Sequence, residues 1–403
     1  REEDAFLAEE DEERNAEQAE RNARMRDLLR QRRLRQSAVS AAPAAEPEAF
    51  MSTVNAGVGA AKPAVDESQP PWFAPRPHVW SVVLRLHEEM LDFIAYMKHT
   101  REEVIARRRW VRCVGLAARS LWPTCKVRVF GSFHTGLSLP NGDVDVAILD
   151  VPCTPGTAMK ILADHMLARG EISWLEIIES AKVPVMKIRS QACGLRADVV
   201  FNQHDGIESS KFIRDRLREF PHMKHLLVFL KYFLLQRGLH ETYEGGMGSY
   251  LLCNVVLHFL QRHPSRQNGA FASISLGHLL FDLLRYYGRE FRYDTHGISV
   301  MEGGYTFRKD QLGKGKSKGK GKGKGGIALC LQSPLDAAVD LGASCFRIAI
   351  LRNLFHHGYH CLCHLFTSQA PPEASMLSPF LLDPAHRVIS TRYQLMAEQP
   401  VAL

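Results

Sequence analysis

The sequence predicts an α+β fold in which a small mixed sheet with helices is inserted in, or followed by, an all-helical domain. Strand-like segments with apolar side chains at every second position gather between residues 112 and 205. Most of the remaining chain up to residue 370 has apolar residues three and four apart, as helices do. The length of 403 residues exceeds that of a usual single domain, and 45% hydrophobic residues are enough for a sizeable core. No stretch has about 18 consecutive apolar residues, so the sequence offers no membrane-spanning helix.

The two ends of the chain lack these patterns. Residues 1–36 are dense in Glu and Arg and have too few apolar residues to dock a helix. Residues 37–77 are rich in Ala, Pro, Ser and Gly, as flexible linkers are. We therefore predict a disordered tail and linker over residues 1–77 and a loose C-terminal tail over residues 371–403. The first residue is Arg rather than Met, so the natural N-terminus, with any targeting segment, is expected to lie upstream.

Two helices are predicted ahead of the sheet. The segment LRLHEEMLDFIAYM, residues 84–97, has the spacing of an amphipathic helix. A second helix is predicted from Glu102 to Leu121, because Trp122 is followed by a proline that stops it. We expect residues 78–111 to pack with the helical domain that follows the sheet.

The sheet domain is predicted over residues 112–205, with strands near 126–130, 143–149, 171–180, 183–190 and 197–201. The central helical domain is predicted over residues 206–370, with helices near 212–220, 225–237, 249–262 and 276–288. A flexible Gly-Lys loop, residues 313–326, interrupts this domain.

The positive charge of the chain is concentrated in that loop. The net charge is +7, and the loop holds six lysines, so subtracting them leaves +1. The folded part is therefore nearly neutral, and general attraction to nucleic acid is not expected from it. The loop itself can offer RNA phosphates a flexible, sequence-independent polycation, or it can be a solvated linker without a role.

The cysteines bear on the compartment of the protein, and a cluster of histidines and cysteines at residues 356–364 raises the question of a zinc site. Nine scattered cysteines fit a reducing compartment better than secretion. The cluster His356-His357-Gly-Tyr-His360-Cys361-Leu-Cys363-His364 contains atoms that suit zinc, and on a helix several of them share one face. The spacing does not match a standard zinc finger, so we favour a helix that packs in the second domain.

The central constellation is a set of three carboxylates with a Gly-Ser pair. Asp143 and Asp145 alternate with valines in one predicted strand, so their side chains point to one face. Asp198 lies in another strand and could accept the proton of an attacking hydroxyl. Gly131 and Ser132 would let backbone and hydroxyl approach a phosphate. Oxygen ligands in this pattern suit one or two Mg²⁺ ions and two-metal phosphoryl or nucleotidyl transfer.

The segment VFGSFHTGLSLPNGDVDVAILD resembles the catalytic signature of the DNA-polymerase-β-like nucleotidyltransferases, and more narrowly that of Trf-type poly(A) RNA polymerases. The resemblance extends over residues 71–366. It includes, in family order, KVPVMKI, ADVVFNQHDGI, LKYFLLQRGL, GGMGSY, LGHLLFDLLRYYGREFRY and SPLDAAVDLGAS. It implies a nucleotidyltransferase palm and a helical, PAP-associated central domain.

The resemblance also implies roles for individual residues. Asp143 and Asp145 resemble the metal ligands, and Asp198 resembles the third carboxylate, which binds metal and acts as the base on the RNA 3′-hydroxyl. The residues that match nucleotide-contacting positions are Gly131, Ser132, Gly206, Lys231, Ser249, Tyr250 and Asp340. Among these, Lys231 matches the triphosphate-binding lysine and Tyr250 the platform on which the base stacks.

The sequence departs from the family in its base-recognition loop. The family reads approximately Asn-Asp-Val-Gly-Arg, whereas this chain has Val339-Asp340-Leu341-Gly342-Ala343. An amide and a guanidinium are replaced by apolar groups that cannot distinguish hydrogen-bond donors from acceptors. Weaker preference for ATP is therefore expected.

The expected function is template-independent addition of AMP from ATP to RNA 3′ ends, with Mg²⁺, or alternatively Mn²⁺, as cofactor. The altered loop keeps a uridylyltransferase or mixed-base tailing enzyme as an alternative, and a catalytically silent RNA-binding scaffold is the alternative of another class. The resemblance further implies an RNA-binding partner of the zinc-knuckle type, an exosome-linked helicase, and a nuclear or nucleolar location, with the cytoplasm as an alternative.

Overall fold

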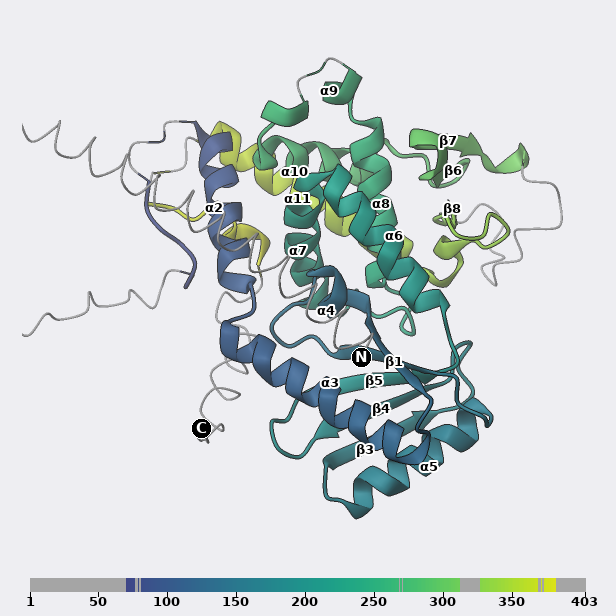
Figure 1. Cartoon of the computed structure of the whole chain (residues 1–403). Coiled ribbons are helices and arrows are strands. Elements are labelled where there is room, and N and C mark those ends of the chain that lie inside the picture. Colours follow the sequence, from purple (N-terminus) through teal and green to yellow (C-terminus); the bar gives the residue numbers. More distant parts are fainter. Residues whose placement is uncertain are drawn as a thin grey trace, which may run out of the picture. The chain divides into compact units, whose positions relative to one another are not determined.

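The computed structural model describes residues 70–76, 79, 81–267, 269, 271–311, 327–368, 371 and 373–381 (Figure 1). The predicted N-terminal tail up to residue 69, the Gly-Lys loop and residues 382–403 lie outside the described residues. Within these ranges the α+β prediction is confirmed, because small mixed sheets are combined with many helices.

The larger sheet consists of β1 (Lys126–Phe130), β2 (Val144–Leu149), β3 (Ile172–Ile178), β4 (Val185–Ser190) and β5 (Arg196–Phe201). Its strand order is β1-β2-β5-β4-β3. Strands β2 and β5 run parallel, and the other neighbours run antiparallel. Each of the five strands lies where the two-residue alternation predicts one.

The helices that precede the sheet in the chain are α2 (Val82–Met97) and α3 (Arg101–Leu121), and those between its strands are α4 (Gly131–Thr135) and α5 (Pro155–Ala168). Those after it are α6 (Asp205–Glu219), α7 (Pro221–Leu235), α8 (Ser249–Arg262), α9 (Pro264–Gln267), α10 (Leu276–Arg285) and α11 (Ile348–Thr367). A π-helical turn, Tyr286–Glu290, follows α10. Among the described helices, none combines the length and the apolar character needed to cross a membrane.

The alternation of side chains gives the larger sheet an apolar face and a polar face. Val144, Val146 and Ile148 of β2 are fully buried in one cluster with residues of α3 and α5. Both helices lie alongside the sheet (Figure 1). Asp145 lies between two of these valines, so its side chain points to the opposite face. That opposite face is where a polar site can form.

The helical part has its own large apolar core. Helix α2 packs against α7 and α10, while α3 lies on the sheet. Phe93 of α2 is fully buried and makes edge-to-face contact with Phe229 of α7, with ring centroids 5.9 Å apart. Helix α2 is therefore joined to the helices that follow the sheet, although the sheet lies between them in the sequence. The prediction that residues 78–111 pack with the helical domain is wrong for residues 101–111, because they belong to α3, whose Trp110 is buried in the core of the sheet domain.

The prediction that the central domain is all-helical is wrong in one respect. A small sheet of order β7-β6-β8 lies there, made of β6 (His296–Ser299), β7 (Tyr305–Arg308) and β8 (Leu331–Gln332). Strands of two to four residues are too short to show a recognisable alternation. β6 and β8 are also separated in sequence by the Gly-Lys loop, so their pairing has no local signal.

The segments expected to be loose are packed where the structure describes them. Trp72 is buried and contacts the ring of Phe93 edge-on. Met376 and Leu377 are fully buried in the helical core. The prediction of a loose stretch after Pro371 is therefore wrong for residues around Met376, because a short irregular segment can bury apolar side chains without any periodicity.

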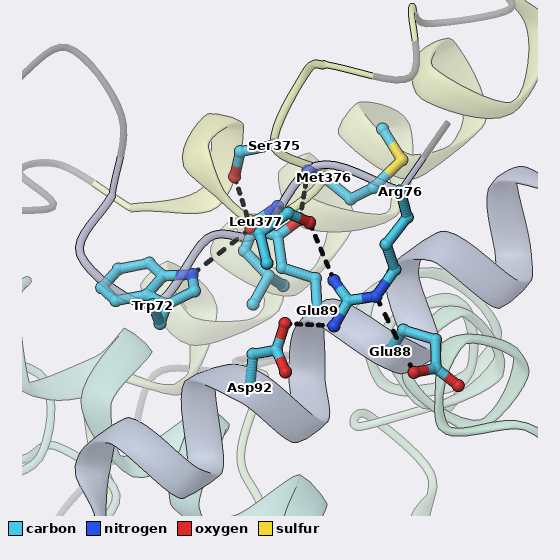
Figure 2. A network of polar contacts seen from close by, with 9 residues as sticks. Trp72, Arg76, Glu88, Glu89, Asp92, Ser375, Met376 and Leu377 are labelled. Atoms are coloured by element: carbon cyan, nitrogen blue, oxygen red, sulfur yellow. Dashed lines mark hydrogen bonds and ion pairs between the residues drawn. The ribbon is translucent and has the colours of Figure 1, made fainter. Parts of the chain in front are cut away.

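Glu89 of α2 joins these two segments (Figure 2). Its buried carboxylate accepts hydrogen bonds from the Trp72 indole, from the Ser375 hydroxyl and from the backbone N–H groups of Met376 and Leu377. Burial raises the pKa of Glu89, and these hydrogen bonds act in the opposite direction.

Replacing Glu89 by Ala should leave several buried donors without an acceptor. We expect a loss of about 3 kcal/mol and a thermal unfolding midpoint lowered by at least about 5 °C. Hydrogen exchange at the Met376 and Leu377 amides should accelerate. Glu88→Ala is the matched control, because Glu88 is half exposed and forms only a long ion pair, 3.8 Å to Arg76, among the described residues. Equal midpoints for the two variants would contradict the role of Glu89.

Candidate active site

The site begins where β1 turns into the short helix α4. Gly131 has φ +69°, a left-handed conformation that favours glycine. A Cβ atom at this position would lie 1.9 Å from Oδ2 of Asp145. Phe130 is the register partner of Asp145, so the Gly131-Ser132 turn passes directly over the carboxylate. Only a glycine allows this close approach of the backbone.

The parallel pairing of β2 and β5 brings two of the predicted carboxylates side by side. Asp145 and Asp198 are direct register partners. Asp143 immediately precedes β2, and its carboxylate interacts electrostatically with those of Asp145 and Asp198. The structure thus brings together the three aspartates that the sequence singles out.

Burial and like charges raise the pKa values of Asp145 and Asp143. The pKa of Asp145 rises to about 7 because of burial, and because Asp198 and Asp143 are close. The pKa of Asp143 is also raised, first by burial and then by Asp198. The cluster therefore carries negative charge that its surroundings do not fully compensate.

This charge and the all-oxygen donor set fit Mg²⁺, which prefers carboxylate oxygens. In the described part of the chain, no three His, Cys, Asp or Glu side chains, the three aspartates included, are arranged so that they could hold a metal ion by themselves. That is compatible with Mg²⁺, which is usually held by one or two carboxylates, with waters and substrate phosphates completing the shell. Asp143 and Asp145 are the residues we expect to hold it, together with Asp198.

Lys187 is a member of the site that the sequence prediction missed. It is the register partner of Asp198 on β4, and its Nζ lies 3.0 Å from Oδ2 of Asp198. The signal was a lysine placed between two buried apolar residues of β4, Met186 and Ile188. Such a lysine on the polar face requires a partner across the sheet, which here is the third carboxylate.

Lys231 approaches the same cluster from α7. Its Nζ donates a hydrogen bond to the carbonyl oxygen of Leu137 at 3.0 Å. Burial lowers its pKa, while the negative charge of Asp145 acts in the opposite direction. Lys231 also lines a small cavity with Ser249, the first residue of α8. A positive charge from the helical part thus faces the carboxylates of the sheet.

Gly206 helps to place the Gly131 turn. Its carbonyl accepts from the hydroxyl of Ser210, and that hydroxyl accepts from the Gly131 N–H at 2.7 Å. A Cβ atom at Gly206 would lie 2.5 Å from the ring of Phe130. Gly206 therefore allows the first turn of α6 to pack on the strand that leads into the site; direct contact with a nucleotide stays a prediction.

Tyr250 and Asp340 lie elsewhere in the helical part. Tyr250 is partly buried against its core, next to Ser249. Oδ1 of Asp340 accepts from the backbone N–H groups of Leu331 and Gly342, both at 2.9 Å. Asp340 is thus engaged in shaping its own loop, and its contact with a nucleotide stays a prediction.

The fold and these residues define a nucleotidyltransferase palm joined to a helical domain. Residues 86–215 match the family described as "Poly(A) RNA polymerase, mitochondrial-like, central palm domain", and residues 275–338 match "Cid1 family poly A polymerase". The chain belongs to this family of Trf- and Cid1-type poly(A) RNA polymerases.

Individual relatives agree with this assignment. The chain is 32% identical over 69% of its length to "Poly(A) RNA polymerase CID14" of Cryptococcus neoformans, and covers 36% of that protein. It is 32% identical over 65% of its length to the "Inactive non-canonical poly(A) RNA polymerase protein Trf4-2" of Drosophila melanogaster, and covers 64% of it. The chain thus spans less than two thirds of either relative.

One solved structure is similar over most of the fold. It is described as "Structure and function of the polymerase core of TRAMP, a RNA surveillance complex". The TM-score is 0.70 at 25% sequence identity, and the match covers 78% of this chain and all of that one. This match supports the arrangement of palm and helical domain as a polymerase core.

The carboxylate cluster predicts a pH-dependent stability. Folded Asp145 holds its proton up to about pH 7, whereas the unfolded residue has a pKa near 3.8, so stability falls as the pH rises between these values. Asp145→Asn lacks this loss. Its unfolding midpoint should equal that of the wild type near pH 4. At pH 8 it should exceed the wild-type midpoint by several degrees, which corresponds to a difference in the free energy of unfolding on the order of 2 kcal/mol. Thermal unfolding between these pH values measures the difference.

Mg²⁺ should remove that difference at pH 8 by raising the wild-type midpoint, because it compensates the repulsion. Asp145→Asn should respond weakly. A variant midpoint that stays at or below the wild-type value at pH 8 without Mg²⁺ would show that the carboxylates are not in repulsion.

Proposed function

We propose that this chain is a template-independent RNA 3′-terminal nucleotidyltransferase that adds AMP from ATP, with Mg²⁺, or alternatively Mn²⁺, as cofactor. The observation that carries the proposal is the meeting of Asp145, Asp198 and Lys231 beside the Gly131 turn. These groups provide negative charge for a metal and positive charge for a triphosphate in one place.

Each residue would have a separate task. Asp143 and Asp145, with Asp198, would hold Mg²⁺, which when bound supplies positive charge to the reacting oxygens. Asp198 lies beside Asp145 and would accept the proton of the RNA 3′-hydroxyl. Lys187 keeps Asp198 oriented through their ion pair.

The triphosphate would lie between the two parts of the fold. The left-handed turn at Gly131 brings the backbone close to the carboxylates proposed to bind the metal, as phosphate-binding turns do. Lys231 would supply a point charge for the phosphates from the helical side. Ser249 shares a cavity with Lys231 and could add a hydroxyl.

A catalytically silent scaffold is the second candidate, because the Drosophila relative is named as inactive. This chain, however, retains the three aspartates and Lys231, and the structure brings them together. Retention of the complete charged set supports activity over a scaffold role.

Base preference is expected to be weak. Val339 is half-buried and Ala343 is exposed, and neither side chain can form a hydrogen bond with a base. Tailing with UMP or with mixed nucleotides is therefore the alternative reaction on the same site. Introducing Val339→Asn together with Ala343→Arg should raise the preference for ATP by about 1–3 kcal/mol if both contacts form.

The deciding experiment is primer extension by the purified chain, with a labelled RNA, Mg²⁺ and each nucleoside triphosphate supplied alone. We expect extension with ATP, with kcat/KM for UTP, CTP and GTP within about two orders of magnitude of it. No extension with any nucleotide would favour the scaffold. Extension with UTP in large excess over ATP would favour a uridylyltransferase.

Partners and location are part of the same proposal. A solved structure described as the polymerase core of an RNA surveillance complex supports the view that the chain works with partner proteins. The motif resemblance is the basis for proposing an RNA-binding protein of the zinc-knuckle type and a helicase as these partners, and a nuclear location. The nearly neutral chain outside the Gly-Lys loop fits an enzyme that receives its RNA through a partner.

A further inference from the structure

The His- and Cys-rich segment that the catalytic site does not use forms the outer face of α11. The inner face of this helix is buried through Leu351, Phe355, Gly358, Leu362 and Leu365. The helix prediction is thus confirmed. The histidines are left on the exposed side, where they contribute nothing to the core.

Two of these histidines face one another. His356 and His360 are one turn apart, and their Nε2 atoms lie 3.1 Å from each other. Their rings are nearly perpendicular, with an interplanar angle of 78°. The two ring nitrogens are thus within hydrogen-bond distance, so that one imidazole N–H lies between them.

This spacing is that of two nitrogen ligands on one metal ion. With metal–nitrogen bonds of about 2.0–2.1 Å, nitrogens 3.1 Å apart subtend about 100° at the metal. That angle lies between about 90° in square-planar or octahedral ions and about 109° in tetrahedral ions. Histidines at i and i+4 on one helix face are also the spacing found in helical zinc sites.

We propose that His356 and His360 bind one divalent transition-metal ion of the Ni²⁺, Cu²⁺ or Zn²⁺ class, with water in the remaining positions. Imidazole nitrogen suits these ions, whereas Mg²⁺ prefers oxygen, so the site is distinct from the carboxylate cluster. The ion links two successive turns of α11 and stabilises the helix, which packs on α10 and the π-helical turn.

The side chains around His356 and His360 determine how tightly the pair is expected to bind a metal ion. No third His, Cys, Asp or Glu of the described residues joins the pair. The guanidinium groups of Arg289 and Arg352 act on His356, and their positive charge opposes a cation. We therefore expect affinity in the micromolar range rather than that of a structural zinc site, which uses four ligands.

A second pair offers an internal comparison. His357 and Cys361 are also one turn apart, with Nε2 and Sγ separated by 3.5 Å. Cys361 is partly buried, whereas His356 and His360 are both exposed. A thiolate favours Zn²⁺ over Ni²⁺, so Ni²⁺ is the probe that reports the histidine pair selectively.

The test is calorimetric titration of the full chain, without a polyhistidine tag, with Ni²⁺ at pH 8 in excess Mg²⁺. We expect one Ni²⁺ per chain, a midpoint of unfolding raised by about 2–4 °C, and at least tenfold weaker binding in both His356→Ala and His360→Ala.

His165→Ala is the matched control, because His165 on α5 has Ile161 and Arg169, not metal ligands, at the positions four residues away. It should bind Ni²⁺ as the wild type does. Equal Ni²⁺ affinity in His356→Ala, His360→Ala and the wild type would overturn the proposal. Loss of binding only in His357→Ala would also overturn it, since the ion would then occupy the other pair.

Discussion

Replacing Asp145 by Asn is expected to abolish primer extension, with a fall in kcat/KM of at least about a thousandfold. The substitution removes the charge of the carboxylate that lies under the Gly131 turn and beside Asp198. It keeps the size of the side chain, so the backbone approach at Gly131 is retained. Rates with saturating ATP, Mg²⁺ and labelled RNA measure the loss, and circular dichroism checks that the fold is native.

Asp150→Asn is the control for this prediction. Asp150 lies just beyond the other end of β2 and is exposed, with an ion pair to Lys126. Its φ of 60° is a conformation that Asn adopts as readily as Asp. The same loss of one charge at Asp150 should leave extension within about twofold of the wild type. Near wild-type extension by Asp145→Asn would refute the assignment of the catalytic carboxylates.

The sheet and two of its carboxylates are predictable because their signals are local. A strand with alternating Asp and Val fixes the face of Asp143 and Asp145 without knowledge of the partners. The position of Asp198 beside Asp145 depends instead on the parallel pairing of β2 and β5. That pairing joins segments separated by two strands and a helix, and only the motif resemblance pointed to it.

What the sequence could not predict depends on contacts between distant segments. Lys187 matters because it lies across the sheet from Asp198, and no local pattern gives this register. Ser210 supports Gly131 across 79 positions of sequence. Glu89 looks like a solvated helix residue until the chain near Ser375 covers it. In each case the polar partner is supplied by tertiary structure alone.

Lys231 shows how the helical domain completes the site. Its amino group is held by the Leu137 carbonyl, which belongs to the chain between α4 and β2 of the sheet domain. The residue therefore links the two parts of the fold at the point where the triphosphate is proposed to bind. Burial lowers its pKa, so a substrate anion would restore part of the charge stabilisation that Lys231 loses in the folded protein.

Replacing Lys231 by Met should lower kcat/KM for ATP by at least about a hundredfold, since a buried positive charge that contacts the phosphates is worth about 3 kcal/mol or more.

The stability of the Lys231→Met protein should not fall along with its activity. A lysine whose pKa is lowered on folding destabilises the folded state at pH values below that pKa, and stability returns as the pH rises toward 10.5. Methionine has no such penalty, so the unfolding midpoint at pH 7 should not fall, despite the lost bond to Leu137. Lys160→Met, on α5 and paired only with Glu179 at the surface, removes the same charge and should leave kcat/KM unchanged. A folded Lys231→Met enzyme that keeps its kcat/KM would show that this lysine does not bind the triphosphate.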